Sequence, residues 1–278
     1  MSRVMDTALA VGEERAARPA PVASSALQAV RSRNRFELKY LLPRERAAAL
    51  LTEVLPYMDD DSHGRGTPYV ITSLYYDTPD LRCYWEKVDG LKNRRKLRVR
   101  HYESTVGLRP DSRVYVEVKQ RINRTTQKRR AELPYAAAQA LCAGEDVDSE
   151  PSQAAVVREV RAFVNAFRLE PVSITSYYRR ALVGTDHDPG LRITFDSDIR
   201  YRSTDLSLDS RNPGRHMVPP EQVVVEIKAN DHIPRWVTAL VGAHNARVVR
   251  ISKYCQSIEV AGRAPRSAFH LPQTEARS

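Results

Sequence analysis

Residues 96–100 read Lys-Leu-Arg-Val-Arg, and residues 115–119 read Tyr-Val-Glu-Val-Lys. Successive side chains of a β-strand point to opposite faces, so each segment places its charged residues on one face and its apolar residues on the other. Segments 35–40, 192–196 and 224–228 repeat this pattern. An ordinary half-exposed sheet would carry Thr, Ser and mixed charges on its wet side. Five strands with basic and acidic polar faces instead predict a charged cavity that suits phosphates and a divalent metal.

The order of the elements indicates an antiparallel sheet, because most of the expected strands follow one another without a crossover helix. A polar inner face and an apolar outer face fit a closed barrel with a wet lumen. The sequence therefore predicts an α+β fold, an antiparallel eight-stranded β-barrel with helices packed on the outside. Strands are expected at 35–40, 69–77, 95–103, 113–121, 127–133, 172–183, 191–201 and 222–229, and helices at 43–55, 79–88 (with Thr78 as a cap), 134–142, 152–167, 234–244 and 252–260.

The barrel is expected to occupy residues 34–262 as one domain. Residues 1–33 and 263–278 are rich in Ala, Arg, Pro and Ser without a sustained period, which predicts a disordered arm and a disordered tail.

Composition favours an anionic partner. The chain has 44 Lys and Arg against 34 Asp and Glu, a formal charge of +10, which suits a nucleic acid, a nucleotide, polyphosphate or a membrane surface. Its three cysteines form no CxxC pair, which argues for a reducing compartment and against a thiolate zinc site. No apolar run approaches the roughly 20 residues of a membrane span, and no secretory signal is recognisable. We therefore expect a cytoplasmic protein without a membrane span.

Basic residues repeat on the polar faces of the expected strands. Arginine suits bidentate contacts with phosphate, whereas lysine acts as a mobile point charge. For any one of these residues a solvated face with surface ion pairs is the better interpretation, but that interpretation is weak for the whole set. The set comprises Lys39, Arg98, Arg100, Lys119, Arg179 and Arg192, and Lys128 and Arg130 share a face on their own strand.

Carboxylates share the same faces. Mg²⁺ and Mn²⁺ prefer oxygen ligands and often combine a few carboxylates with substrate phosphates. The alternative is that each carboxylate pairs with a neighbouring Lys or Arg, and Asp198 equally fits a turn at a strand end. The candidates are Glu37, Glu117, Asp196, Asp198 and Glu226.

Other motifs carry less information. Segment 87–100 is the densest basic run, but Leu97 and Val99 indicate that its second half is a strand rather than a nucleic-acid motif. On spacing alone, Ser252 and Lys253 fit a helix cap and a surface lysine better than a phosphate contact at a cavity mouth. The chain lacks a Gly-rich phosphate loop, HExxH and GxSxG, so phosphate binding would depend on side chains.

Ten segments, in this order, resemble the VTC domain, the polyphosphate-polymerase domain of the vacuolar transporter chaperone complex. This family belongs to the CYTH-like triphosphate tunnel metalloenzymes, whose fold is an antiparallel eight-stranded tunnel barrel. The resemblance covers about residues 34–260. The segments are RFELKY (35–40), SLYYDTPDL (73–81), YWEKVDG (84–90), RRKLRVRHY (94–102), VYVEVKQ (114–120), QKRRAEL (127–133), SYYRRAL (176–182), LRITFDSDI (191–199), VVVEIK (223–228) and ISKY (251–254).

The resemblance implies polymerisation of inorganic polyphosphate from the γ-phosphate of ATP, with Mn²⁺ or Mg²⁺ as cofactor. The implied partners are ATP, inorganic phosphate or pyrophosphate, and polyphosphate. Glu226 matches the family's metal-binding glutamate, and Glu117, Glu37 and Asp196 are further metal candidates. The expected catalytic residues are Lys39, Arg98, Arg100, Lys119 and Arg179; the expected substrate-binding residues are Lys87, Lys128, Arg130, Arg192, Lys228, Ser252 and Lys253.

Three alternatives stay open. The first is a triphosphate or tripolyphosphate hydrolase of the same fold, although Glu37-Leu38-Lys39 has one carboxylate fewer than the ExExK of the hydrolytic relatives. The second is a non-catalytic polyphosphate-binding protein. A nucleic-acid binder is the least favoured, because aromatic residues make up only 7% of the chain and tyrosines such as Tyr75 lie in apolar strand contexts.

Overall fold

The computed structural model describes residues 35–102, 108–123 and 125–264. Eight long strands and three short ones alternate with six α-helices and one 3₁₀ turn. The long strands are β1 (Arg35–Pro43), β3 (Tyr69–Asp77), β4 (Asn93–His101), β5 (Arg113–Ile122), β6 (Thr125–Pro134), β7 (Glu170–Gly184), β8 (Arg192–Arg202) and β10 (Gln222–Asn230), and the short ones are β2 (Met58–Asp60), β9 (Arg215–His216) and β11 (Arg247–Val248).

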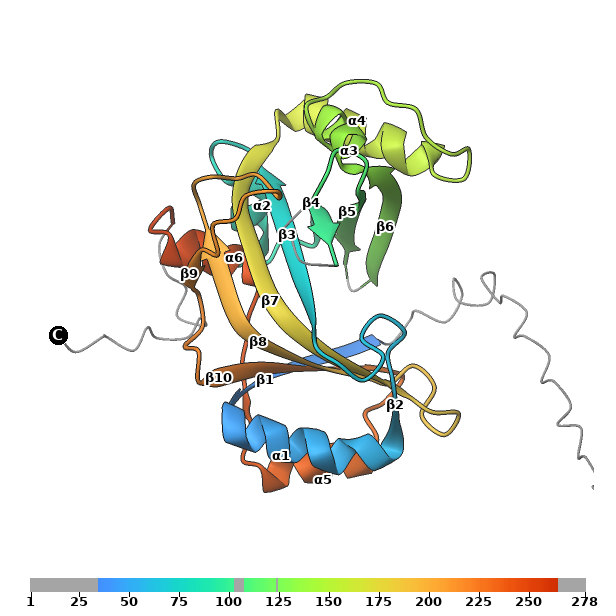
Figure 1. Cartoon of the computed structure of the whole chain (residues 1–278), viewed down its shortest axis with the longest axis vertical. Coiled ribbons are helices and arrows are strands. Elements are labelled where there is room, and N and C mark those ends of the chain that lie inside the picture. The colour runs from blue at the N-terminus through green and yellow to red at the C-terminus, as the bar shows by residue number, and fades with distance from the viewer. Residues whose placement is uncertain (1–34, 103–107, 124, 265–278) are drawn as a thin grey trace, which may run out of the picture. The chain divides into compact units, whose positions relative to one another are not determined.

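The strands form one sheet in the order β11-β1-β10-β8-β7-β3-β4-β5-β6, with β2 paired to β7 and β9 paired to β8 (Figure 1). Every pair is antiparallel. The predicted α+β class and antiparallel sheet are confirmed, and the eight long strands correspond to the eight strands that the sequence led us to expect.

The expectation of a closed hydrogen-bonded barrel is wrong for the described residues, because the order ends at β6 and β11 and no ladder joins them. The physical reason lies at the ends of the sheet. Strand β6 presents the exposed residues 125–128, which include Lys128, and charge on an edge strand opposes further pairing. At the other end β1 pairs with β10 on one side, and on its other side it pairs with the two-residue β11 over Tyr40 and Leu41.

Helices cover the apolar face of the sheet. Helix α1 (Arg44–Val54) and helix α5 (Arg235–Ala243) lie beside β1 and β10, with η1 (Leu55–Tyr57) after α1 (Figure 1). Leu50 of α1 and Val237 of α5 pack in one core cluster with Val225 and Ile227 of β10. Helix α3 (Tyr135–Cys142) and helix α4 (Ala154–Phe167) cover β5 and β6, where Leu141 packs in a second cluster.

Helix α2 (Arg82–Val88) begins three residues later than the expected start at 79. The shift has a local cause, because Leu81 adopts a left-handed conformation with φ 60°. The Thr78 hydroxyl still accepts a hydrogen bond from the Arg82 backbone N–H at 2.9 Å. The capping role predicted for Thr78 is therefore present, displaced from the usual N-cap position.

The face of the sheet that carries the alternating charged residues is called the inner face. Helix α6 (Lys253–Val260) lies on this inner face rather than on the apolar face. The residues that flank and end it, Ile251 and Val260, pack with Ile71 of β3 and Tyr177 of β7. By strand alternation Ile71 shares a face with Ser73, and Tyr177 shares a face with Arg179. The helix therefore fills part of the interior and brings Lys253 into it.

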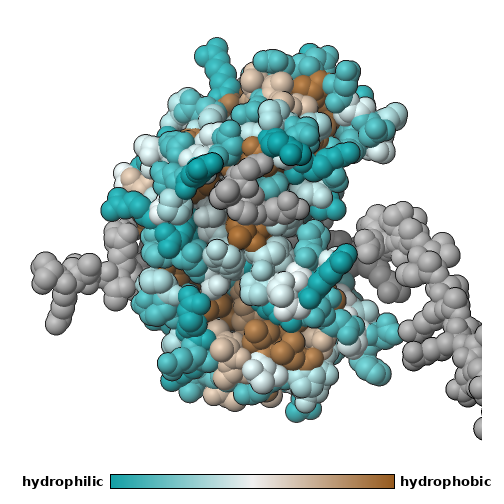
Figure 2. Space-filling view, viewed as in Figure 1, coloured by the Kyte–Doolittle hydropathy of each residue, from teal (hydrophilic) through white to brown (hydrophobic). Residues whose placement is uncertain are grey.

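The described surface is mostly hydrophilic on the face that Figure 2 shows, with apolar patches in its lower part. Phe36, Leu55 and Tyr57 are among the large apolar side chains that are exposed. None of the helices in the described ranges is long and apolar enough to cross a membrane. The predicted arm at 1–33 and residues 265–278 of the predicted tail at 263–278 lie outside the described residues. The first residue of that tail is described, and Arg263 Nη1 donates to the Val172 carbonyl at 3.0 Å.

Candidate functional site

The inner face of the sheet brings the predicted charged residues together. Lys39 of β1 lies opposite Glu226 of β10, and Arg98 of β4 lies opposite Glu117 of β5. Arg179 and Asp196 oppose each other on β7 and β8. The alternating residues on the other face are apolar and buried, as the pattern predicted: Leu97, Val99, Val116 and Val118 are at most 2% exposed.

The first ion cluster is centred on Asp196, which is fully buried. Arg179 donates from Nε and Nη2 to its two oxygens at 2.7 and 2.8 Å. Lys253 of α6 donates to Oδ2 at 2.5 Å. Burial alone would raise the pKa of Asp196, but Arg179 and Lys253 hold it at about 2. Asp196 therefore stays ionised and fixes two cations, one of them from the inserted helix, against the inner face.

The second ion cluster is centred on Glu117, which is 1% exposed. Arg98 Nε donates to its Oε2 at 2.7 Å, and Lys128 of β6 pairs with Oε1. Burial opposes ionisation, but Arg98, Arg100 and Lys128 bring the pKa of Glu117 to about 2. Arg98 Nη1 also lies 3.4 Å from the Tyr75 hydroxyl. Although burial raises the pKa of Tyr75, Arg98 and Arg100 lower it to about 8. This part of the interior therefore carries a strongly positive potential.

The third ion cluster joins β1 and β10. Lys39 Nζ lies 3.0 Å from Glu37 Oε1 and donates to the Ile251 carbonyl at 3.0 Å. Lys228 pairs with Glu226. Burial alone would raise the pKa of Glu226, but Lys39 and Lys228 hold it well below its usual range.

Among the inner cations, Lys119 and Arg100 form no ion pair with a carboxylate within the described part of the chain. Burial and the charges of Lys39 and Lys228 lower the pKa of Lys119 to about 8, although Glu37 acts in the opposite direction. Arg100 donates from Nε to the Ser73 hydroxyl at 3.1 Å and from Nη2 to the Tyr177 hydroxyl at 3.5 Å. An anion entering the interior would meet two cations that no carboxylate engages in a direct ion pair within the described residues.

The other predicted substrate-binding residues lie around these clusters. Burial and the charges of Lys96 and Arg94 lower the pKa of Lys87. Lys87 lies on α2, close to these two residues at the start of β4. Arg130 stacks over the Tyr115 ring at 4.9 Å.

Arg192, Ser252 and Asp198 are each held by a local partner. Arg192 donates to the buried Asp61 at 2.6 Å. Ser252 caps α6 through the Cys255 N–H and accepts from Lys96 Nζ at 3.3 Å. Asp198 has a φ of 49° and pairs with Arg200 and His216, so it takes no part in the three clusters.

Three inner residues were passed over in the sequence. Tyr75 was assigned to an apolar strand context, Tyr177 was not singled out, and Lys96 was placed in the alternating segment 96–100 and in the basic run without a role of its own. Lys253 Nζ lies 4.4 Å from the Tyr177 ring centroid, and Lys96 Nζ lies 4.7 Å from that of Tyr254. The signal was the alternation itself, because Tyr177 shares parity with Arg179, and Lys96 shares parity with Arg98.

The described residues contain no cluster of three His, Cys, Asp or Glu side chains that could hold a metal alone. Asp196 and Glu117 have both oxygens engaged by cations. Burial and the nearby Glu226 both act to raise the pKa of Glu37. Lys39, Lys119 and Lys228 outweigh them, so the pKa of Glu37 is lowered overall. Mg²⁺ commonly uses one or two carboxylates together with substrate phosphates. The Glu37 and Glu226 donor set fits a divalent ion bound in that way.

The family model described as the VTC domain matches residues 34–261. No curated protein matches the chain. A putative adenylate cyclase from Bacillus halodurans is 15% identical with a TM-score of 0.45, over 78% of this chain and 92% of that one. A putative adenylyl cyclase from Hippeastrum, described as having a dominant triphosphatase activity, is 14% identical with a TM-score of 0.42, over 85% of this chain and 100% of that one.

Proposed function

The chain belongs to the VTC domain family, and we propose that it is a polyphosphate polymerase that transfers the γ-phosphate of ATP to a growing inorganic polyphosphate chain. Family membership supports chemistry on triphosphates or polyphosphate. The observation that carries the proposal is the pair of inner cations, Lys119 and Arg100, that have no carboxylate partner among the described residues. Their charge favours a polyanion in the interior.

Phosphoryl transfer depends mostly on positioning and on neutralising charge. In the proposed reaction Lys39, Arg98, Arg100 and Lys119 contact the β- and γ-phosphates of ATP. The terminal oxygen of the acceptor phosphate attacks the γ-phosphorus, the bond from that phosphorus to the bridging oxygen breaks, and ADP leaves. The acceptor oxygen is already anionic, so the reaction requires no protein base.

The state of the carboxylates favours transfer over hydrolysis. A hydrolase benefits from a general base near the attacking water, and a group with a strongly lowered pKa is a poor base at neutral pH. Asp196 and Glu117 have pKa values of about 2, and the pKa of Glu226 is lowered well below its usual range. We assign Asp196 and Glu117 as positioning residues, because they hold Arg179 and Arg98 through hydrogen bonds.

Mn²⁺ or Mg²⁺ is the proposed cofactor, with Glu226 and Glu37 as its protein ligands. When bound together with substrate oxygens, the ion would neutralise part of the phosphate charge.

The test is to incubate the full chain with ATP and Mn²⁺ or Mg²⁺, with and without pyrophosphate as primer, and to follow ADP, free phosphate and polyphosphate. We expect ADP and polyphosphate to increase together. Arg100→Gln should lower kcat by about 10²-fold, as removal of one donor to a developing oxyanion does. The matched control is Lys92→Gln, which removes one charge from an exposed position outside the three clusters.

ADP with free phosphate alone would assign the chain as a hydrolase. Tight polyphosphate binding without turnover would assign it as a binding protein. Full activity in a folded Arg100→Gln variant would show that the inner face is not the site of the reaction.

A further inference from the structure

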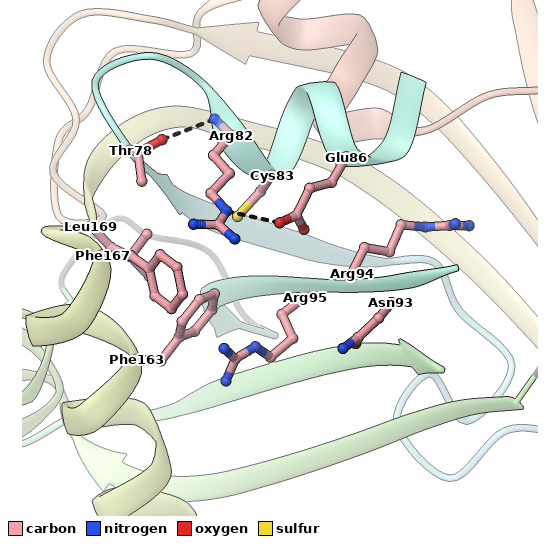
Figure 3. A pocket seen from close by; sticks show the side chains of 10 residues that line it. All are labelled: Thr78, Arg82, Cys83, Glu86, Asn93, Arg94, Arg95, Phe163, Phe167 and Leu169. Carbon is pink, nitrogen blue, oxygen red and sulfur yellow. Dashed lines mark hydrogen bonds and ion pairs between the residues drawn. The ribbon is translucent and has the colours of Figure 1, made fainter. Parts of the chain in front are cut away.

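A separate cavity lies on the other face of β4, between α2 and α4 (Figure 3). Its volume is about 90 Å³. Arg95 lines it, and by strand alternation Arg95 points to the opposite face from Lys96 and Arg98. This cavity is therefore distinct from the charged interior. Its lining includes Arg82 and Glu86 of α2, Asn93 and Arg95 of β4, and Phe163 and Phe167 of α4.

Two guanidinium groups in this cavity lie against aromatic rings. The Arg82 Cζ is 4.4 Å from the Phe167 ring centroid. The Arg95 Cζ is 4.3 Å from that of Phe163 and 5.5 Å from that of Phe167. Figure 3 shows both arginines turned towards the two rings from different elements. Contact with a ring face restrains a guanidinium while its N–H donors stay available around the edge.

The lining carries more positive than negative charge. Arg82 Nε donates to Glu86 Oε1 at 2.9 Å, and Glu86 is the single acidic side chain among the lining residues. Arg95 forms no ion pair with any carboxylate in the described ranges. Arg94 also lines the cavity and donates from Nη1 to the Leu91 carbonyl at 2.6 Å. Figure 3 shows the Arg94 side chain turned away from the two rings, so Arg82 and Arg95 against one glutamate leave one positive charge without a counter-charge in the cavity.

We propose that this cavity is a second anion site, which binds an inorganic oxyanion of the phosphate class through Arg82 and Arg95. A restrained guanidinium fork matches the oxygen geometry of phosphate and can bind it in a bidentate manner. The volume has room for a few water molecules, which suits phosphate or one end of pyrophosphate. The inference does not depend on the proposed polymerase activity, because none of these residues belongs to the interior.

The experiment is arginine modification by phenylglyoxal on the full chain, followed residue by residue by mass spectrometry, with inorganic pyrophosphate as the probe. Arg82 has a side chain that is 53% exposed, so it can react. We expect pyrophosphate to slow modification of Arg82 and to leave Arg161 unchanged. Arg161 is the internal control, because it is an exposed arginine on the same α4 helix and pairs with Asp146.

Two variants assign the protection to this cavity. Arg95→Gln should raise the pyrophosphate concentration for half-protection of Arg82 by about tenfold or more, because it removes charge-assisted hydrogen bonds. Lys119→Gln, in the interior, should leave that concentration unchanged. If Arg95→Gln fails to fold, Arg95→Lys, which keeps the charge and loses the fork, replaces it with the same direction of change.

Four results would overturn the proposal: no slowing at Arg82, equal slowing at Arg82 and Arg161, loss of protection in Lys119→Gln, or unchanged protection in a folded Arg95 variant. Equal slowing would mean general screening by the added anion. Protection that is unchanged in a folded Arg95 variant would show that the arginines stack on the rings only as packing.

Discussion

Removal of the Lys119 charge should stabilise the fold while it weakens the site. Lys119 on β5 is influenced by Lys39 and Lys228 across the interior and by Arg98 on the neighbouring strand, and Glu37 offsets them only in part. Burial and these cations lower its pKa from 10.5 to about 8. Lys119→Gln should therefore raise the free energy of unfolding at neutral pH and reduce the affinity for polyphosphate.

The sign and the magnitude follow from the two pKa values. A lysine with a lower pKa in the folded than in the unfolded protein disfavours folding when it is charged. The destabilisation is complete below about pH 8 and is relieved as the pH rises towards 10.5. The full shift would correspond to about 3 kcal/mol. Lys119 faces the interior, but its surface stays accessible to water, which screens its charge and weakens the effect of burial, so we expect about 1 kcal/mol.

The assay is urea unfolding of the wild type, Lys119→Gln and the control Lys92→Gln at neutral and at alkaline pH. Urea is preferred because guanidinium salts would screen the charges. Lys119→Gln should be the more stable protein at neutral pH, and its advantage should shrink as the pH approaches 10.5. Lys92→Gln should stay within about 0.5 kcal/mol of the wild type. A destabilised Lys119→Gln, or an advantage that does not change with pH, would refute the reasoning.

Three further predictions concern buried polar groups. Glu117→Gln should lower the free energy of unfolding by about 2 kcal/mol, because it removes the buried carboxylate that pairs with the partly exposed Arg98 and Lys128. Burial raises the pKa of Tyr75 but Arg98 lowers it to about 8, so ultraviolet titration should show one tyrosine ionising near that pH, and Tyr75→Phe should remove it. Asp77 accepts from three backbone N–H groups and from the Tyr254 hydroxyl, so Asp77→Ala should lower the free energy of unfolding by about 2 kcal/mol, measured in urea.

Each of these predictions has a contrary outcome. An unchanged unfolding midpoint in Glu117→Gln would mean that its cations find other partners. An unchanged titration in Tyr75→Phe would assign the early ionisation to another tyrosine. Amide hydrogen exchange is the second measurement for Asp77→Ala. Unchanged exchange in α2 would show that the Asp77 carboxylate does not stabilise the start of that helix.

The fold could be predicted where the pattern is local and long. Each of the eight long strands has nine or more residues, which is long enough to carry a local signal such as alternation or β-branched and aromatic enrichment, and all eight were expected. Strands β2, β9 and β11 have only two or three residues, too few for any period. The closed barrel was wrong because closure depends on whether β6 meets the other end of the sheet. Those strands are far apart in the chain, and no local pattern encodes their contact.

The site could be predicted as a face but not as a set of pairs. Alternation placed Glu117 and Lys119 on one side of β5, and pairing with the adjacent lysine was an open alternative. The structure follows that alternative on β1, where Glu37 pairs with Lys39, and on β10. On β5, Glu117 pairs instead across the sheet with Arg98 and Lys128. Cross-strand register decided this, and register is not visible in one strand.

The cross-strand choice of Glu117 determines where an anion can bind. The inner carboxylates Asp196, Glu117, Glu37 and Glu226 are all engaged by cations, so an incoming polyanion does not meet the total charge of the interior. It meets the remainder, which includes Lys119. An anion that binds there favours the charged form of Lys119 and relieves the repulsion that lowers its pKa. Because a ligand that binds only the folded state stabilises it, polyphosphate should stabilise the wild type more than Lys119→Gln. The charge that destabilises the empty protein is the charge that the ligand would use.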